Sequence, residues 1–124
     1  MKIKIRFESV EMEATLLDTP TAKAIYEALP IKSIANTWGD EIYFGVSVQA
    51  DLESGAKSEV AIGDLAYWPN MPAFCIFFGP TPASRDATPV AASAVNVFGN
   101  LIYTDIGRLR GIPDGQSVTV ERLD

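Results

Sequence analysis

The chain has 124 residues, of which 48% are hydrophobic and 21% charged, and these proportions are ordinary for a soluble globular protein. Sixteen Asp and Glu against ten Lys and Arg give a net charge of −6. This balance disfavours nucleic acid as a partner, because nucleic-acid binding depends on clustered Lys and Arg. We expect a single domain over residues 1–124 and no nucleic-acid partner.

Histidine is absent, and Cys75 is the only cysteine. The absence of histidine excludes Ser-His-Asp and Cys-His catalysis as well as histidine-ligated metal sites. A single cysteine excludes an internal disulfide and a cysteine-rich zinc site. We therefore expect no metal and no cofactor. Any enzymatic chemistry would have to use carboxylates, tyrosine, lysine, arginine or backbone groups.

Two long uncharged stretches, Leu65–Ser84 and Ala87–Thr104, have to be considered as membrane spans. Prolines, glycines and asparagines interrupt both, and backbone groups broken so often could not be satisfied in lipid. The N-terminus alternates charged and apolar residues, unlike a signal peptide. We predict a cytoplasmic protein with no membrane partner.

The first predicted elements form a hairpin. Lys2–Phe7 alternates basic and apolar residues, which is typical of a half-buried strand whose basic face is solvated. Val10–Leu16 alternates in the same way, and Glu8-Ser9 between the two segments is a plausible tight turn. The basic residues are thus better explained as a strand face than as a nucleic-acid patch.

Two helices are predicted. Asp18-Thr19-Pro20 is a helix start, because a capping oxygen precedes a proline in the first turn. An apolar stripe at i, i+3, i+4 and i+7 follows, and Pro30 ends this longer helix. A short second helix is predicted from Thr104 to Arg110, closed by Gly111, with Ile106 and Leu109 facing inward.

Strand patterns dominate the rest of the chain, and turn residues separate them. The predicted strands are Ile31–Asn36, Glu41–Val48, Val60–Ile62, Ala66–Trp68, Ala73–Phe78, Ala94–Phe98 and Ser117–Leu123. Asp51–Lys57 is the most loop-like segment. Many short strands with one long helix indicate a mainly β protein, a closed barrel or a sandwich, with helices at its ends.

Three passages together resemble a known family. They are NTWGDEIYFGV (Asn36–Val46), GDLAYWPNMPAFCIFFGPTP (Gly63–Pro82) and SAVNVFGNL (Ser93–Leu101). Their order and spacing resemble the small prokaryotic cyclophilin-like proteins, a family of unknown function, over nearly the whole chain. The resemblance implies a closed eight-stranded cyclophilin-like β-barrel with one longer helix and one short helix at its ends.

The resemblance does not imply an enzymatic activity. Cyclophilins are peptidyl-prolyl isomerases, and their signature joins an arginine, a phenylalanine and a glutamine with a more distant tryptophan and histidine. The chain has no histidine and no such segment, and its two glutamines, Gln49 and Gln116, have no matching neighbours. Isomerase activity therefore rests on the fold alone.

The aromatic run Ala73–Phe78 allows two interpretations. It could line an apolar pocket for a proline ring, with Arg85 beyond Thr81 as the donor. Alternatively, Phe74, Ile76 and Phe78 face the core while Cys75, an inert buried thiol, and Phe77 face the covering helix. Just before this run, Tyr67 and Trp68 lie where a strand gives way to a loop, and each is as well placed to line a groove as to pack.

Four further features of the sequence are interpreted as structural or as part of a binding site. If Ile42 and Phe44 pack inward, Glu41 and Tyr43 share the other strand face, which is either solvated or able to bind a ligand. Asp64 is interpreted as a turn residue that caps local N–H groups. Asn96 lies in an apolar strand, so it either braces a loop or projects into a pocket. Gly79–Ser84 is predicted to be a rigid rim rather than a phosphate loop.

The favoured function is a binding module for a small molecule or a proline-containing peptide. The candidate binding residues are Glu41, Tyr43, Tyr67, Trp68, Phe78, Thr81 and Arg85. The first alternative is an enzyme, either a weak prolyl isomerase or an acid/base catalyst that uses Glu41 or Asp86. The second is a homo-oligomer interface, and a monomer and a homodimer are both compatible with the sequence.

Overall fold

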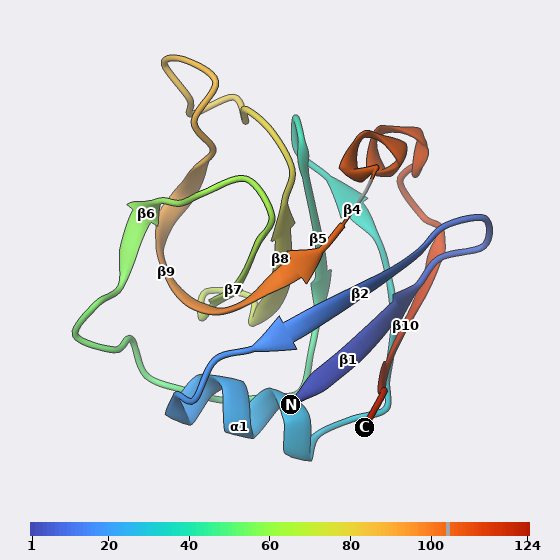
Figure 1. Ribbon diagram of the computed structural model, residues 1–124. Coiled ribbons are helices and arrows are strands. Elements are labelled where there is room, and N and C mark those ends of the chain that lie inside the picture. Colours follow the sequence, from blue (N-terminus) through green and yellow to red (C-terminus); the bar gives the residue numbers. More distant parts are fainter. Residues whose placement is uncertain (104) are drawn as a thin grey trace.

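The computed structural model describes residues 1–103 and 105–124, and most of its regular structure lies in one curled antiparallel sheet (Figure 1). The strands are β1 (Lys2–Arg6), β2 (Glu11–Leu16), β3 (Ile31–Ile34), β4 (Asn36–Thr37), β5 (Glu41–Gly45), β6 (Lys57–Glu59), β7 (Asp64–Trp68), β8 (Ala73–Phe77), β9 (Val90–Ile102) and β10 (Ser117–Arg122). Their order in the sheet is β3-β10-β1-β2-β9-β7-β8-β5-β4, and β6 pairs with β9 beside this path.

The opening hairpin forms as predicted. β1 pairs antiparallel with β2, and Phe7 donates a backbone hydrogen bond to Val10 across the turn. Ile3 and Ile5 are fully buried, whereas the neighbouring basic residues are exposed or half-buried. Alternating side chains on a pleated strand produce this division, so the basic triplet is a solvated strand face.

The two strands at the ends of the curled sheet, β3 and β4, follow one another directly in the sequence. β3 pairs with β10, β4 pairs with β5, and only Ala35 separates β3 from β4. Ala35 keeps its backbone bonds to the β10 side, accepting from Gly115 and donating to Gln116. The mainly β, cyclophilin-like fold predicted from the sequence is confirmed. In detail, the sheet of the described residues has ten strands rather than the eight predicted, and it is not closed into a barrel. The main path of strands ends at β3 and β4 because the chain changes partners at Ala35, and β6 is the one strand beside this path.

The two helices lie at opposite ends of the curled sheet (Figure 1). The α-helix α1 (Pro20–Glu27) begins after Thr19, whose side chain accepts a hydrogen bond from the backbone of Ala22. The short 3-10 helix η1 (Ile106–Gly111) buries Leu109 and packs Ile106 against the core, as predicted. Thr104, where this helix was predicted to start, lies outside the described residues.

The strand boundaries differ from prediction most in β9 and in the segment after β6. β9 runs for 13 residues, far beyond the predicted Ala94–Phe98, because its two halves pair with different partners, β6 on one half and β2 on the other. The predicted strand Val60–Ile62 instead follows the end of β6 at Glu59 and leads into a turn, in which Gly63 adopts a φ of 94°. A positive φ favours glycine and bends the chain sharply into β7.

β8 divides the apolar side chains into two clusters, because successive residues of a strand point to opposite faces. Phe74 and Ile76 join the large core inside the curled sheet, and Phe78 just beyond β8 does the same. Cys75 and Phe77 belong to a second cluster formed with residues of β7 and β9 and with Val60, which follows β6. The inward half of the prediction is confirmed. The outward half is wrong, because β9 and Val60, not the helix, cover this outer face.

No helix in the part of the chain that the structure describes is long and apolar enough to cross a membrane.

Candidate ligand-binding pocket

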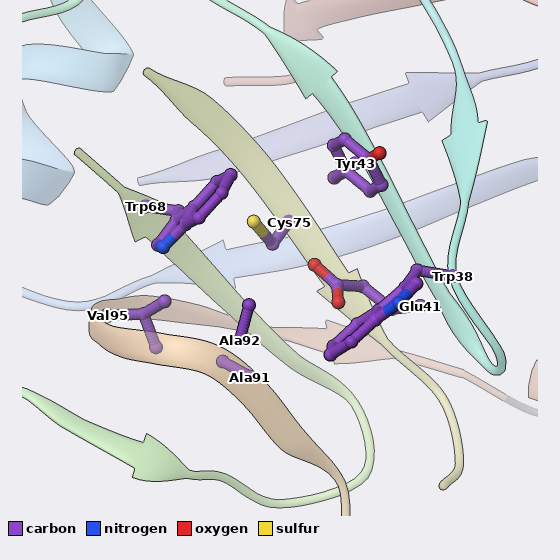
Figure 2. Close-up of a pocket in the computed structure, with 8 residues that line it drawn as sticks. All are labelled: Trp38, Glu41, Tyr43, Trp68, Cys75, Ala91, Ala92 and Val95. Atoms are coloured by element: carbon purple, nitrogen blue, oxygen red, sulfur yellow. The ribbon is translucent and has the colours of Figure 1, made fainter. Parts of the chain in front are cut away.

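A pocket lies on the outer face of β5, β8 and β7, beneath the first half of β9 (Figure 2). Its volume is about 230 Å³. We call it the outer pocket, and its lining residues are Trp38, Glu41, Tyr43, Trp68, Cys75, Ala91, Ala92 and Val95. It is smaller than the range of roughly 300–1,000 Å³ typical of sites for drug-sized ligands, so it suits a small molecule or one group of a larger one.

β5 contributes Glu41 and Tyr43 because its alternate residues, Ile42 and Phe44, are fully buried in the inner core. The two sets of side chains must then point in opposite directions. Tyr43 lies directly opposite Cys75 of β8 in the antiparallel register, so their side chains share one face. The predicted pairing of a carboxylate and a phenol on one strand face is therefore observed.

Trp38 reaches the outer pocket through a tight turn. The backbone N–H of Trp38 donates to Glu41 at 2.9 Å, and the reciprocal bond measures 3.2 Å. Directly opposite residues of a hairpin place their side chains on the same face, so the indole lies beside the carboxylate (Figure 2). Gly39 has a φ of 60°, as the first central position of a type II′ turn requires.

The segment predicted to be a rigid rim supports this turn. Asp40 donates its backbone N–H to Pro80 at 2.9 Å and accepts one from Phe78 at 2.9 Å. A Cβ atom on Gly39 would lie 2.9 Å from the backbone of Thr81. The rim is therefore in close contact with the turn that carries Trp38 and Glu41, and it does not itself line the outer pocket.

Trp68 forms the opposite wall, at the end of β7. Its indole Nε1 donates to the hydroxyl of Ser93 on β9 at 2.7 Å, which fixes the ring against the covering strand. Ala91 and Ala92, also on β9, leave open space because alanine carries only a methyl group. The cavity thus lies between large aromatic walls and small covering residues.

Glu41 is the only acidic or basic residue that lines the outer pocket, and its side chain is only 6% exposed. Burial raises its pKa from 4.5 to about 7, and the hydrogen bond from the Cys75 thiol opposes this in part. The ion pairs of the described residues do not include this carboxylate. It faces the cavity with a thiol, a weak donor, as its polar neighbour.

Cys75 lies at the floor of the outer pocket and is 1% exposed. Burial raises the pKa of its thiol well above the usual value, and the neighbouring Glu41 carboxylate raises it further. The thiolate is the nucleophilic form of cysteine, so this environment disfavours covalent catalysis. The prediction of an inert buried thiol agrees with these surroundings.

The structure brings together three of the seven candidate binding residues, namely Glu41, Tyr43 and Trp68. Tyr67 is buried in the inner core, where its hydroxyl donates to Val48 at 2.8 Å. Its neighbour Trp68 has the opposite orientation, so the alternation of β7 separates the two rings.

The other candidates lie elsewhere. Phe78 is buried in the inner core, and the buried Thr81 hydroxyl donates to the carbonyl of Val90. Arg85 is exposed and lines a separate surface depression with Asp86. Neither Arg85 nor Asp86 lines the outer pocket.

Two polar residues that the sequence singled out have structural partners. Asn96 accepts a hydrogen bond from Glu53 at 2.8 Å and donates to Thr21 and Asp51, so it braces the 51–57 loop. Asp64 accepts from the backbone of Ala61 at 2.9 Å, as predicted for a turn cap. Neither side chain lines the outer pocket.

Sequence reasoning missed Trp38 and the covering residues from β9. The signal for Trp38 was the Gly39-Asp40 turn, which pairs position 38 with position 41. The signal for β9 was weaker, a run of small residues from Ala91 to Ala94 in an otherwise apolar stretch. Nothing local to that run indicates which strand it covers.

Among the described residues, no three acidic or cysteine side chains are grouped to hold a metal ion. What the outer pocket offers is one carboxylate, a thiol and aromatic faces. This set can bind a partly apolar molecule and orient it through one charged contact.

The fold and the pocket define a mainly β protein with a cavity on the outer side of a curled sheet. The model of the cyclophilin-like family matches residues 1–121, so the chain belongs to that family. A similar solved structure is the solution structure of a hypothetical protein from Archaeoglobus fulgidus. It is 48% identical, has a TM-score of 0.82, and the match covers 98% of this chain and 94% of that one. A search of curated proteins finds no match.

Proposed function

We propose that the protein is a binding module that holds a small molecule in the outer pocket. The observation that carries this proposal is the Glu41 carboxylate, which is 6% exposed and faces a cavity without a cationic partner among the described residues. Burying a carboxylate without such a partner costs stability. A group held at that cost in a cavity is a candidate for ligand recognition.

A binding role is favoured over catalysis by what surrounds Glu41. The only other titratable side chains that line the outer pocket are Cys75 and Tyr43. The raised pKa of Cys75 disfavours a nucleophile, and no second carboxylate or lysine is present to form an acid/base pair. Arg85, the donor considered for prolyl isomerisation, lines a different depression.

The chain contains its own reporter for this proposal. Its two tryptophans, Trp38 and Trp68, both line the outer pocket, so intrinsic fluorescence reports directly on occupancy. We would titrate a library of small amines, alcohols, heterocycles and proline-containing peptides, and confirm each hit by ligand-observed NMR.

The matched variants are Ala92→Phe, which places a ring in the outer pocket, and Ala87→Phe, which places the same ring on an exposed loop. Hits should bind the native protein and Ala87→Phe alike and should not bind Ala92→Phe. Hits that bind all three proteins equally would place the binding site elsewhere and contradict the proposal.

A further inference from the structure

The outer pocket combines one carboxylate with aromatic walls, and we infer that its ligand is a small methylated ammonium cation, a tertiary or quaternary amine. This inference rests on the proposed function, because it names the chemical class of the molecule held in the same cavity. It is carried by three properties of the lining, which are its charge, its aromatic faces and its shortage of hydrogen-bond acceptors.

The charge of the lining favours a cation. Glu41 is its only charged group, and no lysine or arginine lines the cavity. The nearby Asp40 is already paired with Arg110 at 3.1 Å, so that arginine is engaged outside the outer pocket. An anionic ligand would be repelled by the carboxylate, whereas a cation would supply its missing counter-charge. The net charge of −6 also favours the approach of cations.

The walls are suited to a cation that carries apolar substituents. Figure 2 shows Trp38 and Trp68 on opposite sides of Cys75, with the ring of Tyr43 on a third side. Aromatic faces attract organic cations through the ring quadrupole, and tryptophan does so most strongly. The remaining lining side chains are small and apolar, so they match methyl groups rather than water.

The shortage of acceptors favours methylated over primary amines. A primary ammonium group has three N–H donors, and each needs an acceptor when it is buried. The side-chain oxygens that line the outer pocket belong to Glu41 and Tyr43 only, and the indole nitrogen of Trp68 donates to Ser93. Methyl groups in place of N–H donors remove this unmet demand and enlarge the apolar contact.

The ligand's charge should couple its binding to protonation of Glu41. The titratable groups that face this carboxylate are Cys75 from β8 and Tyr43 from β5 itself, while the lining residues of β7 and β9 and Trp38 before the turn do not titrate. A quaternary ammonium ion keeps its charge at every pH. Any pH dependence of its affinity near neutrality therefore reports on Glu41.

The test compares choline with its uncharged isostere dimethylbutanol, in which a quaternary carbon replaces the nitrogen, and with ethanolamine, the primary ammonium. Tryptophan fluorescence and calorimetry give the affinities. At about pH 8 choline should bind most tightly of the three, and its affinity should fall about tenfold on lowering the pH to about 6. Dimethylbutanol should not show this fall.

Two variants identify the source of the preference. Glu41→Gln should weaken choline binding by about tenfold or more while leaving dimethylbutanol within about twofold. Glu13→Gln removes the same charge from an exposed position on β2 and should change neither affinity. Trp38→Leu keeps an apolar wall without a π face and should weaken choline several-fold but spare dimethylbutanol.

The possible failures are distinguishable. Equal binding of choline and dimethylbutanol, or no effect of Glu41→Gln on choline, overturns the cation inference and leaves the outer pocket as a site for neutral ligands. Tighter binding of ethanolamine than of choline overturns the preference for methylated amines. No binding of any of the three overturns this inference, and only failure of the whole library then contradicts the proposed function.

Discussion

The two faces of β5 and β8 are built from alternate residues of the same strands, yet one is closely packed and the other is hollow. On the inner face, Phe44 stacks on Phe74 with ring centroids 4.8 Å apart, and Phe74 meets the edge of Phe98 at 5.0 Å. On the outer face, Glu41 and Cys75 lie beneath small residues of β9 and leave a cavity of about 230 Å³.

The difference between these faces comes from what covers them. The inner face meets side chains from the rest of the curled sheet and from α1, and large rings fill the interior. The outer face meets Ala91 and Ala92, which cannot fill the space above Cys75. A strand thus packs the core on one side and borders a cavity on the other, and substitutions on each side test this difference.

The largest effect is expected on the inner face. Phe74→Ala should lower the free energy of unfolding by about 3–5 kcal/mol, because it removes a buried ring and leaves a cavity. Cys75→Ala, the next residue and on the outer face, should cost about 1 kcal/mol. Urea unfolding of both variants measures the difference. Equal losses would contradict the division into a packed and a hollow face.

The second effect is a gain of stability from Glu41→Gln at high pH. The folded protein holds the Glu41 proton up to a pKa of about 7, against 4.5 for an ordinary glutamate, so the native protein loses stability as the pH rises through this range. Glu41→Gln removes that loss and should stabilise the protein by up to about 3 kcal/mol at about pH 8.

Urea unfolding at about pH 5 and about pH 8 measures this effect. The gain should be much smaller at the lower pH, where more of the native carboxyl groups are already protonated. The exposed control Glu13→Gln should show no comparable change between the two pH values. A gain that is the same at both pH values would mean that Glu41 titrates normally.

The third effect concerns the turn that carries Trp38 and Glu41. Gly39→Ala should destabilise the protein by about 1–3 kcal/mol, because Gly39 has a φ of 60° and a Cβ there would approach Thr81 too closely. Gly55→Ala is the control, since a Cβ at Gly55 meets nothing within 4 Å. If both variants unfold at the same urea concentration, the rim does not hold the turn as described.

The smallest effect is expected at the wall formed by Trp68. Ser93→Ala removes the acceptor of the indole N–H and should cost about 1 kcal/mol or less, because both groups are partly exposed. The tryptophan emission spectrum of this variant should change clearly although its free energy of unfolding changes little, because the Trp68 ring loses its fixed position. An unchanged emission spectrum would show that Ser93 does not orient Trp68.

The mainly β fold and part of the outer pocket could be predicted from the sequence for one physical reason, the alternation of side chains along a strand. Ile42 and Phe44 indicated the inner face of β5, which placed Glu41 and Tyr43 together on the other. The same rule could not decide between Tyr67 and Trp68, because both are aromatic and only the pairing of β7 with its neighbours sets which one faces outward.

The rest of the outer pocket depends on long-range pairing that a local pattern does not contain. Ala91 and Ala92 cover it because the first half of β9 leaves β7 and pairs with β6, across a bulged register. For the same reason the sequence assigned Cys75 and Phe77 to the helix rather than to β9. Trp38 could have been included, because a two-residue turn fixes its position opposite Glu41.

The most direct test of the outer pocket as a cation site is the titration of the Glu41 carboxyl group by NMR, without and with saturating choline. We predict a midpoint near 7 for the free protein and a midpoint at least about one unit lower with choline, because a bound cation favours the ionised carboxylate. A midpoint near 4.5 in the free protein, or one that choline leaves unchanged, would contradict the account.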